Sequence, residues 1–229
     1  MRKTVDRVCS AVLVLAVALL IVTASIGLPI YIRPFYYVQI YLWDLPGQTG
    51  HSGADIQAAY DEVLDYLTLP DQPFGTGVFA YSEEGKSHFE DCKVLFDLNA
   101  AVLVISALIV AVLTLLARKG YVRLVRPFGL RPSALAGGIV LGVFGLLAVL
   151  VMLNFDMAFE VFHMLLFPGK DNWLFDPRTD EIITALPIEF FACCAALIGI
   201  SALAASLSLL LRGVKEKRQR LTEQQDDLC

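Results

Sequence analysis

Long apolar stretches alternate with polar segments along this chain of 229 residues. Four stretches reach the roughly 20 residues that an α-helix needs to cross a bilayer. They are residues 8–28, 98–117, 133–153 and 188–211. Glycine and alanine interrupt the last two, and such small residues let membrane helices approach one another closely. The pattern predicts an all-α membrane protein with four transmembrane helices.

The first apolar stretch also has to be compared with a cleaved signal peptide, because it follows the basic start Arg2-Lys3-Thr4-Val5-Asp6-Arg7. Its apolar core of about 20 residues exceeds the roughly 7–15 residues of such peptides. The nearest approach to an Ala-x-Ala cleavage sequence is Thr23-Ala24-Ser25. We therefore expect a retained helix, with residues 1–28 forming the N-terminus and the first span.

Composition agrees with a membrane protein, since apolar residues make up 57% of the chain and mean hydropathy is +0.64. Lys and Arg predict its orientation, because they are enriched in cytoplasmic loops. Most of the 18 basic residues flank one side of the predicted spans: Arg2, Lys3, Arg7, Arg118, Lys119, Arg123, Arg126, Arg131, Arg212, Lys215, Lys217, Arg218 and Arg220. Only five of the 23 acidic residues lie there: Asp6, Glu216, Glu223, Asp226 and Asp227. We expect the cytoplasm to hold both termini, the loop 118–132 and the tail 212–229.

The two segments on the opposite side, residues 29–97 and 154–187, are predicted to form a mainly helical extracytoplasmic cap. A helical pattern begins at Asp55, and Ser82 is placed to cap a second helix that continues into the apolar stretch from residue 98. Residues 155–167 are strongly apolar with helical period, and this period places Asp156, Glu160 and His163 on one face. We expect this third helix to lie in or re-enter the outer leaflet.

The candidate chemistry lies in this cap, which holds all three histidines. His51 is in a Gly/Ser-rich loop and is interpreted as solvated. His88 has Asp91 three residues after it, and His163 has Glu160 three residues before it. A carboxylate at that spacing can orient an imidazole and favour its protonated form, which suits acid–base catalysis. If the chemistry is shared, the rings should lie within about 10 Å of each other, because both must reach one substrate.

Other interpretations of these residues remain open. Two packed, hydrogen-bonded histidines at a membrane interface need no catalytic role. Metal binding by both rings ranks lower, because no third ligand stands at motif spacing. Asp156 and Glu189 lie near the outer ends of spans, where ionisable groups are often functional or mark the exit from lipid. The sequence shows no Gly-x-Ser-x-Gly, Walker or HExxH motif, and no cofactor is expected.

The sequence resembles the bacterial lipoprotein intramolecular transacylases at three places. Ser82-Glu83 with Ser87-His88-Phe89-Glu90-Asp91-Cys92-Lys93 is similar to S-x-x-E…H-M-x-D-V-K. Phe159-x-x-Phe162-His163, Asn172-Trp173-Leu174-Phe175-Asp176-Pro177 and Asp180 are similar to F-x-x-F-H…N-W-x-F-D-P. Leu186-Pro187-Ile188-Glu189-Phe190-Phe191 is similar to L-P-E-x-F-F. The departures, with Phe89 for Met, Cys92 for Val and one extra residue before Glu189, are expected to affect packing more than charge.

The resemblance implies an acyl transfer within a lipoprotein's own lipid anchor. The acyl chain would pass from the sn-2 ester of an S-diacylglyceryl cysteine to the α-amine of that cysteine, giving the lyso form. His163 would accept the amine proton, and a protonated His88 held by Asp91 would stabilise the oxyanion, although the two roles could be exchanged. Lys93 would support the oxyanion or a headgroup, and Trp173 would support the site.

The resemblance also implies a multi-pass protein of the bacterial cytoplasmic membrane, with the active site on its outer face. The diacylglyceryl lipoprotein substrate would enter laterally from the outer leaflet, and the phospholipid bilayer is the other expected partner. No nucleic acid is expected, because topology already explains the basic inner side. A non-enzymatic membrane accessory or small transport protein is the alternative, although the inverted repeats common in transporters are not seen in the sequence.

Overall fold

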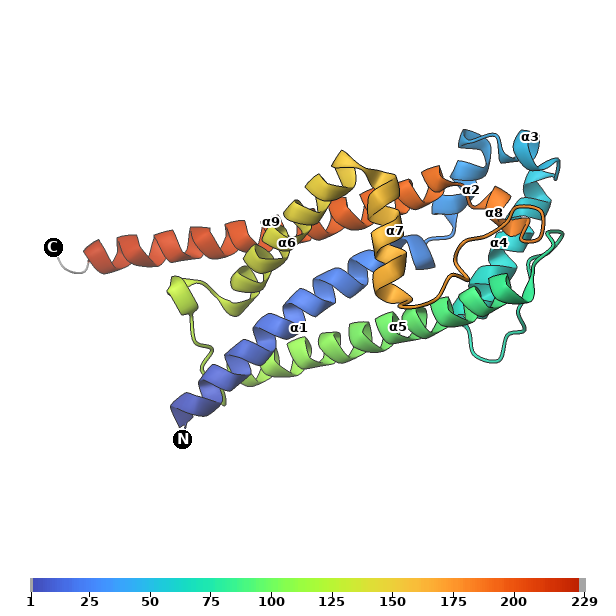
Figure 1. Ribbon diagram of the computed structural model, residues 1–229. Helices are drawn as coiled ribbons and strands as arrows, with labels where there is room; N and C mark the ends of the chain where they lie inside the picture. Colours follow the sequence, from blue (N-terminus) through green and yellow to red (C-terminus); the bar gives the residue numbers. More distant parts are fainter. Residues whose placement is uncertain (1, 227–229) are drawn as a thin grey trace. The chain divides into compact units, whose positions relative to one another are not determined.

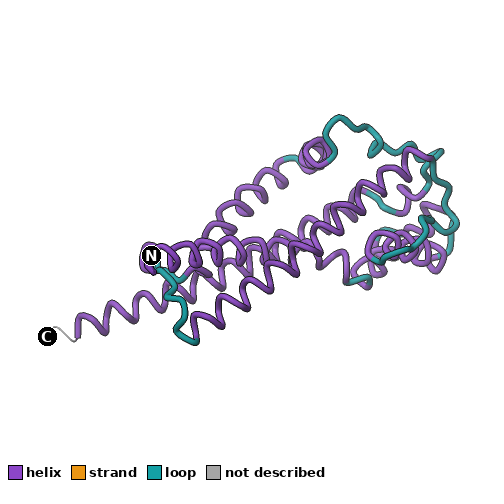
Figure 2. The backbone as a smooth tube through the Cα atoms, turned by 90° about the horizontal axis from the view of Figure 1, so that it is seen from below, coloured by secondary structure: helices purple, strands orange, loops and turns teal. Residues whose placement is uncertain are grey.

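The computed structural model describes residues 2–226, and every regular element within that range is helical (Figure 1). The α-helices are α1 (Arg2–Tyr31), α2 (Pro34–Leu42), α3 (Leu45–Thr49), α4 (Gly53–Thr68), α5 (Glu83–Arg118), α6 (Pro132–Leu153), α7 (Phe155–Leu166), α8 (Ile182–Ala185) and α9 (Ile188–Asp226). A short 3-10 helix, η1, covers Pro127–Gly129. Figure 2 shows loops joining these helices, without a strand in residues 2–226.

Four of these helices, α1, α5, α6 and α9, are long and apolar enough to cross a membrane. The predicted all-α fold with four membrane helices is therefore confirmed. Each observed helix extends beyond its apolar stretch. The polar turns from Glu83 to Asp97 precede the apolar part of α5, and α9 continues to Asp226 through most of the predicted tail. Residues 1 and 227–229 lie outside the described residues.

The chain divides into two compact units. The first unit comprises residues 2–25, 101–149 and 199–226, and its apolar core includes Leu13, Val17 and Ala202. The predicted close approach of helices occurs at Gly137, where a Cβ atom would lie 2.6 Å from the carbonyl oxygen of Ser206. Any larger residue there would push α6 and α9 apart, since the contact is with rigid backbone.

The first turns of α1 hold the loop between α5 and α6. The Asp6 carboxylate accepts a hydrogen bond from the backbone N–H of Arg123 at 2.9 Å, and the Ser10 hydroxyl accepts one from Val125 at 2.8 Å. Both side chains are buried. These bonds satisfy loop amides that would otherwise be enclosed without partners.

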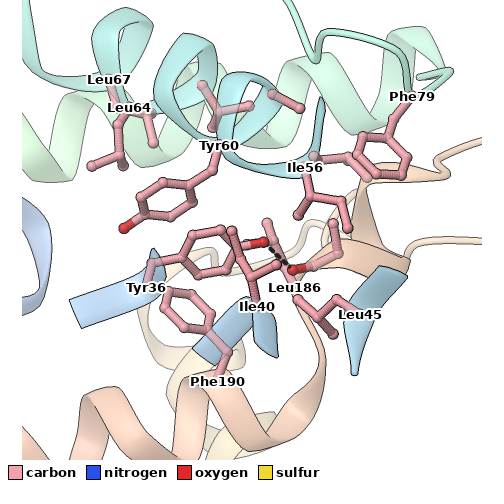
Figure 3. Packing of buried hydrophobic residues seen from close by; sticks show 14 of the residues in the cluster. Tyr36, Ile40, Leu45, Ile56, Tyr60, Leu64, Leu67, Phe79, Leu186 and Phe190 are labelled. Carbon is pink, nitrogen blue, oxygen red and sulfur yellow. Dashed lines mark hydrogen bonds between the residues drawn. The ribbon is translucent and has the colours of Figure 1, made fainter. Parts of the chain in front are cut away.

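The second unit comprises residues 26–100 and 150–198 and contains all three histidines. Its core is centred on Tyr36 of α2 and Tyr60 of α4, whose rings stack with centroids 3.8 Å apart (Figure 3). Phe190 of α9 meets Tyr36 edge-on, and the Tyr36 hydroxyl donates to the carbonyl of Ala185 at 2.6 Å. The core thus ties α2 and α4 to the segment that follows α7.

Candidate active site

The polar start of α5 places His88. Ser82 caps the helix as predicted, because its hydroxyl accepts a hydrogen bond from the Gly85 N–H at 2.9 Å. Asp180, which is buried, accepts from both the backbone N–H and the hydroxyl of Ser82 at 2.8 Å. His88 follows one and a half turns later with 6% of its surface exposed. The cap therefore ties the helix that carries His88 to the loop before α8.

The second histidine is placed by α7. Asn154 caps this helix by accepting from the Met157 N–H at 3.0 Å. His163 is 8% exposed, and its Nδ1 lies 2.8 Å from the carbonyl oxygen of Phe159. A carbonyl oxygen can only accept, so Nδ1 carries the proton of the neutral ring. Nε2 is then left with a free lone pair, the position of a base.

The two imidazole rings lie side by side, with centroids 5.9 Å apart and planes inclined by 36°. The expected separation of less than about 10 Å is confirmed. Aromatic rings enclose the pair: Trp173 stacks on His163 at 4.8 Å, while Phe167 and Phe175 meet His88 at 4.8 and 5.5 Å. The enclosure removes most water from both histidines.

Burial sets the charge of both rings. It lowers the pKa of His88 to about 4, with the nearby His163 as the second cause, and it also lowers the pKa of His163. Both rings are therefore neutral near pH 7. Asp91 favours the protonated form of His88, as expected, but the loss of hydration outweighs its charge and leaves the ring neutral.

Asp91 serves other partners. Its carboxylate forms an ion pair with Lys170 at 2.5 Å and accepts from Nδ2 of Asn172 at 3.0 Å. Lys170 is the largest cause that lowers the pKa of Asp91. Asp91 thus fixes the loop after α7 to α5, rather than orienting His88 directly.

Cys92 contacts His88 from the next turn of α5, with its Sγ 3.4 Å from Nε2 of the ring. Burial raises the pKa of this thiol to about 12, so the sulfur carries a proton. A neutral thiol can donate weakly to Nε2, and on that basis we assign the ring proton of His88 to Nδ1. Cys92 was expected to affect packing more than charge, and its contact with His88 adds a hydrogen-bonding role to that prediction.

Two polar atoms of the site lack a partner. Nδ1 of His88 and Oδ1 of Asn172 are both buried, and neither forms a hydrogen bond with any residue in the range 2–226. Asn172 still raises the pKa of His88 as a hydrogen-bonding neighbour, although the contact lacks the geometry of a formed hydrogen bond. A hydrogen-bond donor on His88 and an acceptor on Asn172 are thus both enclosed at the site.

The other predicted supporting residues lie elsewhere. Lys93 donates to the carbonyls of Tyr66 and Leu69, where it closes the end of α4. Asp156, Glu160 and Glu189 are exposed and form no hydrogen bond or ion pair within the described part of the chain. Carboxylates on an apolar helix stay hydrated where they can, which explains why Glu160 does not turn toward His163.

A cavity of about 620 Å³ lies beside the enclosure. It is lined by Glu160, Met164, Phe167, Pro168, Gly169, Lys170, Asp171, Trp173 and Leu174. Trp173 and Phe167 form its boundary with the histidines, because both also pack on the imidazole rings. Between residues 2 and 226, no three His, Cys, Asp or Glu side chains come together in a way that could hold a metal ion.

Comparison with known proteins identifies the family to which the chain belongs. The family model for lipoprotein intramolecular transacylase Lit matches residues 11–191. The chain belongs to the Lit family. No curated protein sequence matches it.

Solved Lit structures share the fold. The chain superposes on the membrane-integral Lit of Bacillus cereus with a TM-score of 0.83 and 26% identity, covering 95% of this chain and 99% of that one. Structures of Bacillus cereus Lit with one histidine replaced by arginine or alanine match with TM-scores of 0.74, also at 26% identity. They cover 95% of this chain and 96% and 97% of the other chains. With its four apolar helices, this Lit family member is a multi-pass cell membrane protein of an acyltransferase family.

The sequence interpretation did not include three residues of this candidate site. Asn172 stood inside the matched motif but was given no role. Lys170 had no recognisable signal, since it acts through a contact that depends on the folded chain. Helical spacing could have placed Cys92 beside His88, because residues four apart face each other on a helix.

Proposed function

We propose that this protein transfers the sn-2 acyl chain of an S-diacylglyceryl cysteine to the α-amine of the same cysteine. The product is a lipoprotein with an N-acyl group and a monoacylglyceryl thioether. The observation that carries the proposal is the pair of buried, neutral imidazoles 5.9 Å apart in a member of the Lit family. The ester and the amine belong to one molecule, so holding them together supplies much of the rate.

His163 is proposed as the base. The α-amine has a pKa of roughly 8 in solution, and its proton becomes far more acidic once nitrogen bonds the ester carbon. Nε2 of His163, with its free lone pair, accepts that proton. The bond between the carbonyl carbon and the sn-2 oxygen then breaks. The imidazolium returns its proton to the sn-2 oxygen, which leaves as a hydroxyl.

His88 is proposed as the oxyanion donor, and it acts as a neutral ring. Its Nδ1–H is enclosed without a partner. The ester oxygen that becomes negative during attack supplies the missing acceptor, and such hydrogen bonds are strongest in water-poor sites. A neutral donor also avoids placing a second positive charge 5.9 Å from the imidazolium formed at His163.

The membrane arrangement forms part of the proposal. The basic residues support cytoplasmic termini, so residues 29–97 and 154–187 would lie at the outer face. The apolar side chains exposed on α7, such as Phe162 and Leu165, are suited to contact with lipid. The substrate would reach the histidines laterally from the outer leaflet.

The test is the N-terminal acylation of a lipoprotein made together with wild type, His88→Ala or His163→Ala, determined by mass spectrometry. The lyso form is expected with wild type and is expected to be lost with either variant. His51→Ala is the matched control, since His51 lies against Phe79 and contacts neither ring. Lyso-form product from both of the first two variants would contradict the assignment.

A further inference from the structure

The nitrogen and the oxygen of the Asn172 side-chain amide lie in different surroundings. Its Nδ2 donates to Asp91 Oδ2 at 3.0 Å and reaches the hydroxyl of Ser87 at 3.4 Å. This fixes the orientation of the side chain, because carboxylate and hydroxyl oxygens call for the nitrogen on their side. The oxygen is consequently on the other side, where it is buried and has no donor in the described chain.

Buried polar atoms are nearly always hydrogen-bonded, and exceptions call for an explanation. Here two exceptions occur in one enclosure, and they are of opposite kinds. His88 Nδ1–H is a donor without an acceptor, and Asn172 Oδ1 is an acceptor without a donor. Asn172 contacts Ser87 and Asp91, which flank His88 on α5. It also acts on the ring as a hydrogen-bonding neighbour that raises the pKa, although the contact lacks the geometry of a formed hydrogen bond.

The reacting substrate presents the complementary pair of groups. At the moment of attack, an amine N–H stands beside a carbonyl oxygen that is becoming negative. We infer that Asn172 Oδ1 accepts a hydrogen bond from the substrate α-amine while His88 Nδ1–H donates to the ester oxygen. This inference rests on the proposed function and adds a residue that binds the nucleophile.

A neutral amide suits this task better than a carboxylate. A carboxylate would favour the charged ammonium and raise the pKa of the amine, which would withhold the lone pair needed for attack. An amide oxygen orients the N–H without adding charge. The one carboxylate that touches Asn172, Asp91, is already neutralised by Lys170.

The test is the affinity of the full-length protein for two dialkyl-ether analogues of the lipopeptide, which cannot transfer an acyl group. One analogue keeps the α-amine and the other has hydrogen in its place. Wild type is expected to prefer the amine analogue by roughly tenfold, the worth of about one hydrogen bond. Asn172→Leu should lose the preference while keeping its affinity for the des-amino analogue. Ser87→Ala, which touches only the nitrogen side, should keep the preference.

A second variant covers the case in which leucine disturbs the loop. Asn172→Asp alone would set two carboxylates 3.0 Å apart, so it is combined with Asp91→Asn, which returns an amide donor to the pair. This double variant keeps an oxygen at the site, so it should bind the amine analogue at least as tightly as wild type while kcat for the ester substrate falls at least tenfold. If Asn172→Leu retains the preference, or if the double variant loses affinity and kcat together, the inference is wrong. Neither result affects the proposed function, which fails only if wild type makes no lyso-form lipoprotein or if both histidine variants still make it.

Discussion

Trp173 stacks on the imidazole of His163 with ring centroids 4.8 Å apart and planes inclined by 25°. The indole N–H donates to the carbonyl of Lys170 at 3.0 Å, which anchors it to the loop after α7. The face of His163 is thereby held against an aromatic ring whose own position is fixed. Rotation of the imidazole is restricted by this stack together with the bond from Nδ1 to Phe159.

Trp173→Ala should lower the transfer rate by about three- to tenfold, the worth of an aromatic stacking pair. Loss of the stack lets His163 leave the orientation in which Nε2 serves as base. Trp173→Phe keeps a ring without the N–H and should retain most of the rate. Initial rates on a diacylglyceryl lipopeptide in detergent micelles measure both, and equal rates for alanine and phenylalanine would show that stacking is unimportant.

Acid should destabilise the protein through His88. Its pKa is about 4 in the folded state and near the ordinary 6.5 when unfolded, so the unfolded chain binds more protons between these values. The stability is fully present above pH 6.5 and is lost as the pH falls toward 4, by up to about 3 kcal/mol. His163, whose pKa is also lowered, adds to the loss in the same direction.

The measurement is the apparent Tm in detergent at pH 7 and pH 5. Wild type should lose more Tm on acidification than His88→Gln, because the glutamine does not titrate. The control His51→Gln should behave as wild type. A His88→Gln protein with the same acid sensitivity as wild type would contradict the assignment of a neutral buried ring.

Cys92 should determine which nitrogen of His88 carries the proton. Its buried thiol faces Nε2 at 3.4 Å, so the Nδ1–H tautomer is expected in wild type. Cys92→Val removes the donor and should yield a mixture of tautomers. Long-range ¹H–¹⁵N spectra of protein labelled at histidine would report this, with His163 as an internal reference held in the Nδ1–H form by Phe159. Unchanged His88 shifts in the valine variant would exclude the role.

The sequence predicts the helices well, because apolar runs and capping residues act locally. Ser82 was enough to predict where α5 begins. The apolar period of residues 155–167 was enough to predict the extent of α7. Contacts between distant segments depend on the folded chain and cannot be predicted from local spacing. Asp91 was expected to hold His88 three residues earlier, yet Lys170 binds it from the loop after α7. Such choices depend on which partner the fold brings near, and spacing along one helix carries no information about this.

Gly85 in the first turn of α5 lies close to the side chain of Asp180. A Cβ atom at Gly85 would lie 2.1 Å from Asp180 Oδ1 and 3.0 Å from the ring of Phe175. Asp180 cannot move aside freely, because it is buried and bonded to Ser82. Gly85→Ala should therefore lower Tm and also the transfer rate, since Phe175 packs against His88.

Gly142 in α6 provides the matched control for Gly85, because apart from the local backbone of its own helix and its chain neighbours no described heavy atom lies within 4 Å of the Cβ position there. Alanine is preferred to glycine inside a helix by roughly 1 kcal/mol, so helix propensity alone would favour both substitutions. Opposite effects on Tm, a fall for Gly85→Ala and a small rise for Gly142→Ala, would isolate the crowding at Asp180. If both variants gain Tm, the cap of α5 tolerates a methyl group. The position of His88 would then not depend on the contact between Asp180 and Ser82.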